Sequence, residues 1–263
     1  MPVADPRVVV LNKEEMFKAV KFGKIRLREG LEELRSADIF KLNEDFLTAA
    51  VFSRLLYMPS EALSTLLLRD VNVKLGEVAE STFWPTWSVQ PKDAEAHNVE
   101  PDLYIQSEGL DLIVEAKRYD DPVCQGPEQW AREWAAWHQS DYFDSQKPVL
   151  LLAIGGLGTS PDTTKARAQS ARDAANNYLL TKFPGVPAIQ ATGVSWREIY
   201  VRLTEDPGDS VQAQLLRDIR EILGYFGHRT CEHLVDLARR MKDSKNSGIH
   251  LRSLSVLEGH LFT

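Results

Sequence analysis

Two carboxylates and a lysine lie where two short strands are expected to end side by side. Asp102 follows Pro101, and twelve residues separate it from the tripeptide Glu115-Ala116-Lys117. Side chains alternate across a strand, so Glu115 and Lys117 share one face of their strand. Charge at the end of an apolar strand is costly unless it is paired or binds a metal. The residue types and their spacing therefore predict a polar centre at this point.

A hairpin turn over residues 107–109 would set the strands antiparallel and bring Asp102 close to Glu115 and Lys117. The two carboxylates and a backbone carbonyl would form part of the oxygen shell that Mg²⁺ prefers, with water completing it. Such a metal lowers the pKa of a bound water and neutralises phosphate charge. Lys117 would orient or help to deprotonate that water and stabilise developing negative charge. The chemistry predicted is phosphodiester hydrolysis with Mg²⁺ or Mn²⁺.

Pro101-Asp102, followed after twelve residues by Glu115-Ala116-Lys117, resembles the signature of the PD-(D/E)XK nuclease superfamily. Restriction endonucleases, Holliday-junction resolvases and RecB-like exonucleases belong to that superfamily. The resemblance implies catalytic roles for Asp102, Glu115 and Lys117, with Asp102, Glu115 and the Ala116 carbonyl binding the metal. Judged by element order, it extends over about three-fifths of the chain, from residue 43 to residue 203.

Two predicted helices carry further candidates for the site. One begins after Asn43 and ends before Met58-Pro59, and the resemblance makes Glu44 in its first turn an auxiliary metal ligand. A glutamate at a helix start is equally explained by the helix dipole. The helix predicted over residues 128–139 carries Gln129, an auxiliary residue by a weak match and more readily a structural one.

The remaining pattern predicts an α/β fold with a mixed central sheet flanked by helices, restriction-endonuclease-like by resemblance. Further helices are expected at residues 14–19, 31–36, 60–69, 164–181, 211–223 and 231–241. Strands are expected at residues 8–11, 83–89, 102–106, 110–117, 148–154 and 196–203, with a loop over 90–100. A boundary at Pro207-Gly208 divides a nuclease core, 41–206, from a C-terminal helical extension, 207–263, and residues 1–40 are expected to pack on the core.

Composition limits the classes of protein that the chain can represent. Its 263 residues are 43% hydrophobic and 26% charged, which is ordinary for a globular protein. The apolar runs are too short to cross a bilayer, and no secretory leader is recognised at the N-terminus. Only Cys124 and Cys231 occur, too few for a disulfide framework or a four-cysteine zinc site, so a cytoplasmic protein is expected.

The charge balance is unusual for a protein that binds DNA alone. The formal net charge is −7, whereas DNA-binding domains usually show a basic excess. Lys165, Arg167 and Arg172 on one predicted helix are candidates for phosphate contacts, and they are equally ordinary as solvated surface. The acidity predicts that a protein partner or a homo-oligomer recruits the DNA.

These observations predict a Mg²⁺- or Mn²⁺-dependent DNA endonuclease, with the DNA substrate implied by the resemblance. By analogy with small superfamily members, it would be the effector nuclease of a prokaryotic antiviral defence or restriction system. The alternative is a non-catalytic DNA-binding or protein-interaction subunit with a nuclease-like fold. The glycines over residues 155–158 lack the Gly-Lys-Ser/Thr ending of a phosphate-binding loop, which disfavours nucleotide hydrolysis.

Overall fold

The computed structural model describes residues 44–71, 73–141, 143–144, 147–205 and 210–228. The helices are α3 (Glu44–Leu55), α4 (Ser60–Leu68), α5 (Pro127–Gln139), α6 (Pro161–Lys182), α7 (Trp196–Glu205) and α8 (Ser210–Tyr225). The strands are β1 (Val78–Phe83), β2 (Trp87–Val89), β3 (His97–Val99), β4 (Leu103–Ser107), β5 (Asp111–Ala116), β6 (Val149–Ile154) and β7 (Ala191–Val194). The elements predicted within residues 1–40 and 231–241 lie outside the described residues.

A five-stranded mixed sheet forms the centre of the fold. Its strand order is β1-β4-β5-β6-β7, and β2 pairs with β3 in a separate two-stranded sheet. The β1-β4 and β4-β5 pairs are antiparallel, whereas β5-β6 and β6-β7 are parallel. The predicted α/β class, with a mixed sheet and flanking helices, is confirmed, and so is the antiparallel hairpin of β4 and β5.

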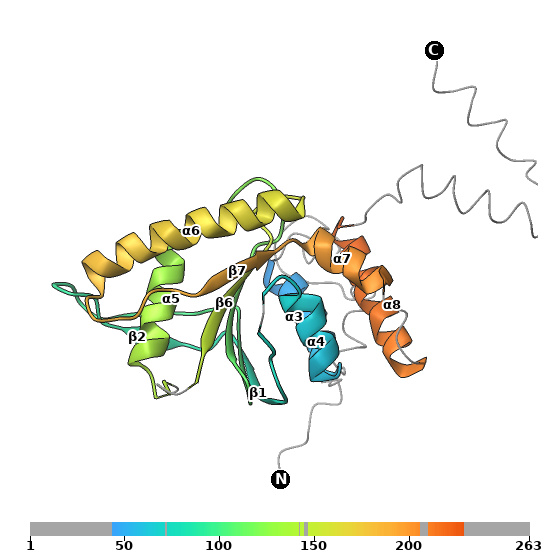
Figure 1. Cartoon of the computed structure of the whole chain (residues 1–263), viewed down its shortest axis with the longest axis horizontal. Helices are drawn as coiled ribbons and strands as arrows, with labels where there is room; N and C mark the ends of the chain where they lie inside the picture. Colours follow the sequence, from blue (N-terminus) through green and yellow to red (C-terminus); the bar gives the residue numbers. More distant parts are fainter. Residues whose placement is uncertain (1–43, 72, 142, 145–146, 206–209, 229–263) are drawn as a thin grey trace, which may run out of the picture. The chain divides into compact units, whose positions relative to one another are not determined.

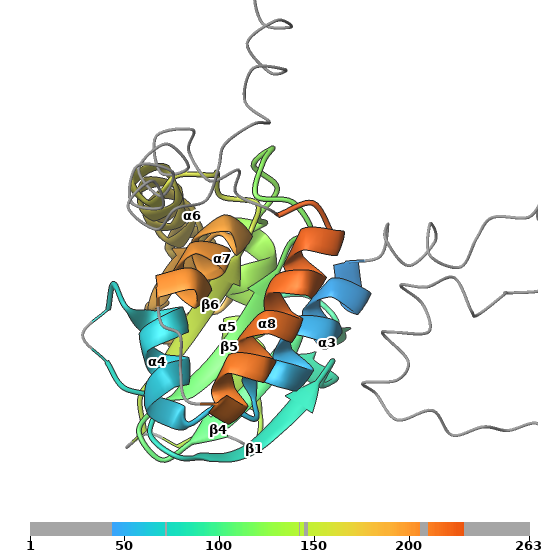
Figure 2. The same cartoon turned by 90° about the vertical axis from the view of Figure 1, so that its right-hand side faces the viewer.

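Helices cover both faces of this sheet, as Figures 1 and 2 show. Leu112 and Val114 of β5 belong to an apolar cluster that includes buried residues of α3, α4, α7 and α8. Ile113, on the opposite face of the same strand, belongs to a second cluster with residues of α5 and α6. Every residue of β5 and β6 is buried, as expected for central strands covered on both sides.

The strand predicted over residues 83–89 is wrong, because the chain leaves the sheet in its middle. β1 ends at Phe83, and β2 begins at Trp87 in the other sheet. Trp84 has a φ of 49°, a left-handed conformation that breaks strand pairing, and Pro85 follows it. The predicted loop over residues 90–100 contains the short strand β3.

The strand predicted over residues 196–203 is also wrong, because these residues form helix α7. Ser195 and Glu198 cap its start: Glu198 Oε2 accepts from the Ser195 N–H at 3.1 Å, and Ser195 Oγ accepts from the Glu198 N–H at 3.0 Å. Trp196, Ile199 and Leu203 are buried at helical spacing. The strand of this region is β7, which ends directly before the cap.

Helix α8 packs against the core rather than standing apart from it. It contacts α3, and the rings of Phe46 and Phe226 lie 6.1 Å apart. It belongs to a compact unit that ends at His228, whereas the predicted boundary at Pro207-Gly208 lies outside the described residues. Among the described helices, none combines the length and the apolar character needed to cross a membrane.

Candidate functional site

Asp102, Glu115 and Lys117 meet at the edge of the sheet where β4 begins and β5 ends. Asp102 Oδ2 accepts a hydrogen bond from the Ala116 N–H at 2.7 Å, which ties the two strands and leaves Oδ1 for a ligand. Lys117 Nζ forms an ion pair and hydrogen bond with Glu115 Oε1. Asp102 is 8% exposed and Glu115 is 1% exposed, so both carboxylates are largely removed from water. The hairpin brings the three predicted residues together.

Helix α3 delivers Glu44 to the same place from one side of the sheet. Glu44 Oε2 accepts from the Arg118 N–H at 2.7 Å, and Oε1 lies 3.5 Å from Lys117 Nζ. Lys117 therefore lies between the carboxylates of Glu44 and Glu115. Both Glu44 oxygens contact protein groups, so this geometry gives Glu44 a positioning role for Lys117, and its role as an auxiliary metal ligand stays a prediction.

Helix α5 brings two further side chains from the other side. Gln129 Nε2 donates to Glu115 Oε1 and to Glu133 Oε1, each at 2.9 Å. Glu133 is 1% exposed, and its Oε2 has no hydrogen-bond partner among the described residues. Glu133 was not among the residues predicted from the sequence. Its signal was a carboxylate one helical turn after Gln129, on a face otherwise occupied by tryptophans.

The loop after β6 fixes the backbone of Lys117. The Lys117 N–H donates to the Ile154 carbonyl, and the Trp196 indole N–H donates to the Lys117 carbonyl, both at 2.7 Å. Gly155 and Gly156 have φ values of 67° and 64°, and a Cβ on Gly155 would collide with the Lys117 carbonyl oxygen. The glycines that interrupt the apolar run thus allow close packing on the candidate site.

The electrostatics of this cluster favour a bound cation. Burial, and then the charge of Glu115, raise the pKa of Asp102 from 3.8 to about 7. Burial likewise raises the pKa of Glu115, and burial together with the Glu115 charge raises the pKa of Glu133 well above its ordinary value. Four carboxylates gather around one lysine, so an added positive charge would relieve their repulsion.

Lys117 is held in its charged form. Burial by itself would lower the pKa of Lys117, but the charges of Glu115, Glu44 and Asp102 and the hydrogen bond to Glu115 outweigh it and raise that pKa. A protonated lysine donates hydrogen bonds and stabilises negative charge, and it does not accept a proton at neutral pH.

The donor set fits a magnesium ion only in part. Within the described part of the chain, no group of three or more His, Cys, Asp or Glu side chains is arranged to hold a metal. Asp102, Glu115 and the Ala116 carbonyl are the oxygen donors that could hold one, while Glu44 is paired with Lys117 and accepts from the Arg118 backbone N–H. Mg²⁺ is commonly held by one or two carboxylates and several waters, so these three groups could supply part of its shell, with water completing it.

The basic residues predicted to contact DNA lie on α6 and make local contacts. Arg167 Nη1 donates to the Leu157 carbonyl at 3.3 Å and lies 3.5 Å from Asp121. Arg172 Nε lies 3.8 Å from Asp173, and Lys165 is exposed. Among the contacts of the described residues, none joins these side chains to the carboxylate cluster.

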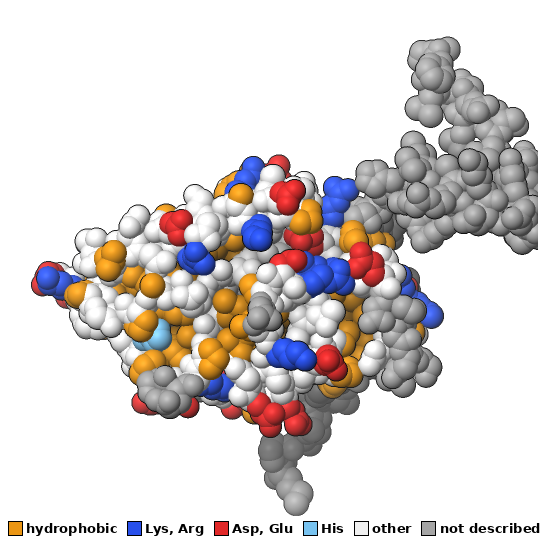
Figure 3. Space-filling view, in the orientation of Figure 1, with side chains coloured by type: hydrophobic (Ala, Val, Ile, Leu, Met, Phe, Trp, Pro, Cys, Tyr) orange, Lys and Arg blue, Asp and Glu red, His pale blue; other side chains and the backbone are white. Residues whose placement is uncertain are grey.

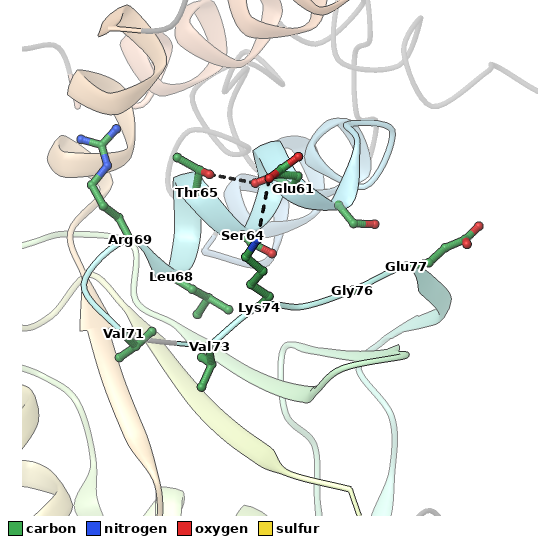
Figure 4. Close-up of a pocket in the computed structure, with 11 residues that line it drawn as sticks. Glu61, Ser64, Thr65, Leu68, Arg69, Val71, Val73, Lys74, Gly76 and Glu77 are labelled. Carbon is green, nitrogen blue, oxygen red and sulfur yellow. Dashed lines mark hydrogen bonds and ion pairs between the residues drawn. The ribbon is translucent and has the colours of Figure 1, made fainter.

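A cavity of about 780 Å³ lies between α4 and the segment that leads to β1 (Figure 4). Its lining includes Ser64, Arg69 and Lys74, and Lys74 Nζ lies 3.9 Å from Glu61. The cavity adjoins the start of β1, whereas Asp102 lies beside the end of that strand. At about 3.3 Å per residue, the six residues of β1 separate the cavity from the carboxylates by roughly 17–20 Å.

Comparisons with known proteins give no activity. No model of a protein family matches the chain. Uncharacterized protein PM0110 of Pasteurella multocida is 28% identical over 192 residues, which cover 71% of this chain and 70% of that protein. The crystal structure of protein of unknown function AF1548 covers 74% of this chain and 99% of its own, at 14% identity and a TM-score of 0.27, too low to support an argument.

Proposed function

We propose that the protein is a Mg²⁺- or Mn²⁺-dependent phosphodiesterase that acts on DNA as an endonuclease. The observation that carries this proposal is the cluster of four carboxylates around Lys117, built at one sheet edge by β4, β5, α3 and α5. Burying several carboxylates together raises the free energy of the folded protein, and a bound cation would offset their repulsion. The resemblance to PD-(D/E)XK nucleases supports a DNA substrate.

The contacts of each residue in the cluster support a specific role in this reaction. Asp102, Glu115 and the Ala116 carbonyl would hold the metal, which would supply an acidified water and neutralise phosphate charge. Lys117, kept protonated by its neighbours, orients that water and stabilises the negative charge that develops on the phosphate. Glu44 fixes Lys117 from α3, and Gln129 fixes Glu115 from α5. A cytoplasmic role in antiviral defence or restriction, with a protein partner that recruits the DNA, is the setting we propose.

The test is cleavage of supercoiled plasmid and of linear DNA with Mg²⁺, with Mn²⁺ and with EDTA. Wild type is compared with Asp102→Asn and Lys117→Ala. Lys74→Ala is a matched control, because Lys74 also faces a glutamate, at 3.9 Å, but is 85% exposed. We expect metal-dependent cleavage that Lys74→Ala retains and that both site variants lose.

The outcomes separate the two functional classes. Activity that survives both site substitutions would mean that another centre does the chemistry. DNA binding that needs no metal, together with no cleavage when several divalent metals are tried, would favour a non-catalytic DNA-binding subunit with this fold. Cleavage that appears only with linear ends would identify an exonuclease instead of an endonuclease.

A further inference from the structure

Two exposed aromatic residues lie on either side of the candidate centre along the edge of the sheet. The Trp84 N–H donates to the Asp102 carbonyl at 3.2 Å, on the β1 side. Tyr119 follows Lys117 by two residues, and its carbonyl accepts from the Gly156 N–H at 2.6 Å, on the β6 side. Trp84 is 37% exposed and Tyr119 is 48% exposed. Across the sheet edge the order is therefore Trp84, Asp102, Lys117, Tyr119.

Trp84 holds its position at a conformational cost. Its φ of 49° is in the left-handed region, which a bulky side chain rarely adopts. Its ring lies 5.4 Å from that of Phe83, yet more than a third of the residue stays in water. This strain lies beside a candidate catalytic residue and the ring is only partly buried, which points to a role in binding.

Tyr119 is supported from behind by a cation. The Arg118 guanidinium carbon lies 4.6 Å from the centre of the Tyr119 ring, within the range of a cation–π interaction. Arg118 is itself 8% exposed, so its guanidinium lies against the ring from the protein side while much of Tyr119 remains open to solvent. An exposed ring with a positive charge beside it suits a base attached to a phosphate backbone.

The charge distribution favours stacking over phosphate contacts. The net charge is −7, and acidic and basic side chains are interspersed over the face drawn in Figure 3. Continuous duplex DNA is bound largely through basic side chains that neutralise phosphates. Single strands are bound in addition by aromatic rings on which unpaired bases stack, which depends less on basic charge.

We propose that Trp84 and Tyr119 form a stacking platform for unpaired bases on both sides of the reacting phosphate. The substrate is then single-stranded DNA, or an unpaired segment within DNA, rather than continuous duplex. This substrate class rests on the proposed phosphodiesterase function of the centre between the two rings. Duplex DNA hides its base faces and cannot use the platform without local opening.

Binding tests the platform without any need for cleavage. Fluorescence anisotropy in EDTA would compare the full-length protein on a single-stranded oligonucleotide, its duplex and the duplex with a single-stranded tail. The variants are Trp84→Ala, Tyr119→Ala, Trp84→Phe and Tyr119→Phe, each checked by thermal melting. Tyr57→Ala is the matched control, because Tyr57 is 74% exposed and lies beyond the far end of α3 from Glu44.

We expect the single strand and the tailed duplex to bind more tightly than the duplex. Each alanine variant should weaken single-strand binding by about 5- to 100-fold, the usual effect of removing one stacking ring. The phenylalanine variants should recover most of the affinity, and Tyr57→Ala should match wild type. Because Tyr119→Ala and both phenylalanine variants keep an aromatic ring at position 84, a Trp84→Ala protein that fails to fold leaves the test intact.

Three results would overturn the platform: equal affinity for single strand and duplex, alanine variants that bind like wild type, or no binding of single strands. The experiments distinguish an absent platform from an absent nuclease activity. Duplex cleavage that requires Lys117 but ignores Trp84 and Tyr119 would remove the platform and keep the nuclease. Ring-dependent binding with no metal-dependent cleavage would remove the nuclease and keep the platform.

Discussion

Asp102 occupies a position where its charge lowers the stability of the fold. The carboxylate is 8% exposed, and burial together with Glu115 raises its pKa from 3.8 to about 7. The unfolded chain loses this proton near pH 4, whereas the folded chain keeps it until about pH 7. The folded state therefore binds more protons across that window, and its stability falls as the pH rises from 4 to 7.

Removing this charge should stabilise the metal-free protein. Each pKa unit corresponds to about 1.4 kcal/mol, so we expect Asp102→Asn to raise the free energy of unfolding by about 1–3 kcal/mol at pH 8. The amide oxygen can still accept from the Ala116 N–H. Urea unfolding in EDTA would measure the gain, which should shrink towards pH 4.

Asp111 provides the matched control for that substitution. It is 1% exposed at the other end of the same hairpin, but it is paired with Lys147 at 2.6 Å and with the Tyr104 hydroxyl at 2.6 Å. Asp111→Asn should therefore destabilise the protein by about 1–3 kcal/mol. If both variants change stability in the same direction, the charge at Asp102 is not the strain we infer.

A divalent cation should stabilise the fold, and more so at higher pH. Below about pH 7 a proton competes with the metal for Asp102, so binding is weaker. We expect the rise in melting temperature caused by Mg²⁺ to be larger at pH 8 than at pH 6, and to be lost in Asp102→Asn. A rise of equal size at both pH values, or in the variant, would place the metal elsewhere.

At the scale of elements, the position of Lys117 depends on the turn that follows β6. A Cβ on Gly155 would collide with the Lys117 carbonyl oxygen and lie 3.0 Å from that of Tyr119. Gly155→Ala should therefore lower the free energy of unfolding by about 2–4 kcal/mol and reduce cleavage, since backbone strain adds to the clash. Chemical unfolding and the plasmid assay would measure both effects.

Gly185→Ala is the control that separates the cost of a left-handed backbone from the cost of a steric clash. Its φ of 94° also disfavours a side chain, but an added Cβ would meet nothing within 4 Å. Gly185→Ala should show the conformational cost alone, about 1–2 kcal/mol, with cleavage unchanged. Equal losses of stability and activity in the two variants would show that contact with Lys117 is unimportant.

The elements that the sequence predicted best are those specified by signals from residues close together in the chain. The β4-β5 hairpin was predictable because apolar alternation and the turn before Gly109 are local signals. The 196–203 segment is rich in aromatic and β-branched residues, which favours a strand, whereas the spacing of Trp196, Ile199 and Leu203 and the Ser195/Glu198 cap indicate a helix. The break between β1 and β2 depends on the left-handed φ of Trp84, which a tryptophan side chain does not predict.

The candidate site was predictable only where its residues follow one another along strands. Asp102, Glu115 and Lys117 were found by spacing, because the hairpin fixes their neighbours. Glu133 was missed because its closeness to Glu115 comes from how α5 lies on the sheet, through Gln129. Whether Glu44 faces a metal or Lys117 likewise depends on packing between α3 and β5, which spacing does not determine.

At the scale of the whole molecule, the site exists only when both faces of the sheet are covered. Glu44 comes from the helical layer on one face, and Gln129 comes from the layer on the other. Glu115 on β5 and Lys117 directly after it lie between them. Closing the two apolar clusters thus assembles the carboxylate cluster, and the free energy of packing outweighs the repulsion that burial creates.

The acidic balance of the molecule leads to a prediction about its C-terminal residues. The compact unit that ends at His228 holds α3 to α8, while residues 229–263 contain six Lys or Arg and four Asp or Glu. We expect a chain ending at His228 to melt within about 4 °C of the full chain, since a loss of about 1 kcal/mol moves a domain of this size by 2–4 °C. Its DNA affinity should fall, and its salt dependence should become shallower, because six basic side chains that can neutralise phosphates are removed. Full-length Arg239→Ala/Arg240→Ala/Lys242→Ala, which removes three of these six basic residues that lie close together in the sequence, should reproduce both changes in filter-binding assays over a range of salt. Unchanged affinity in both proteins would place the DNA contacts within the compact unit, and would leave stacking at Trp84 and Tyr119 as the main source of binding.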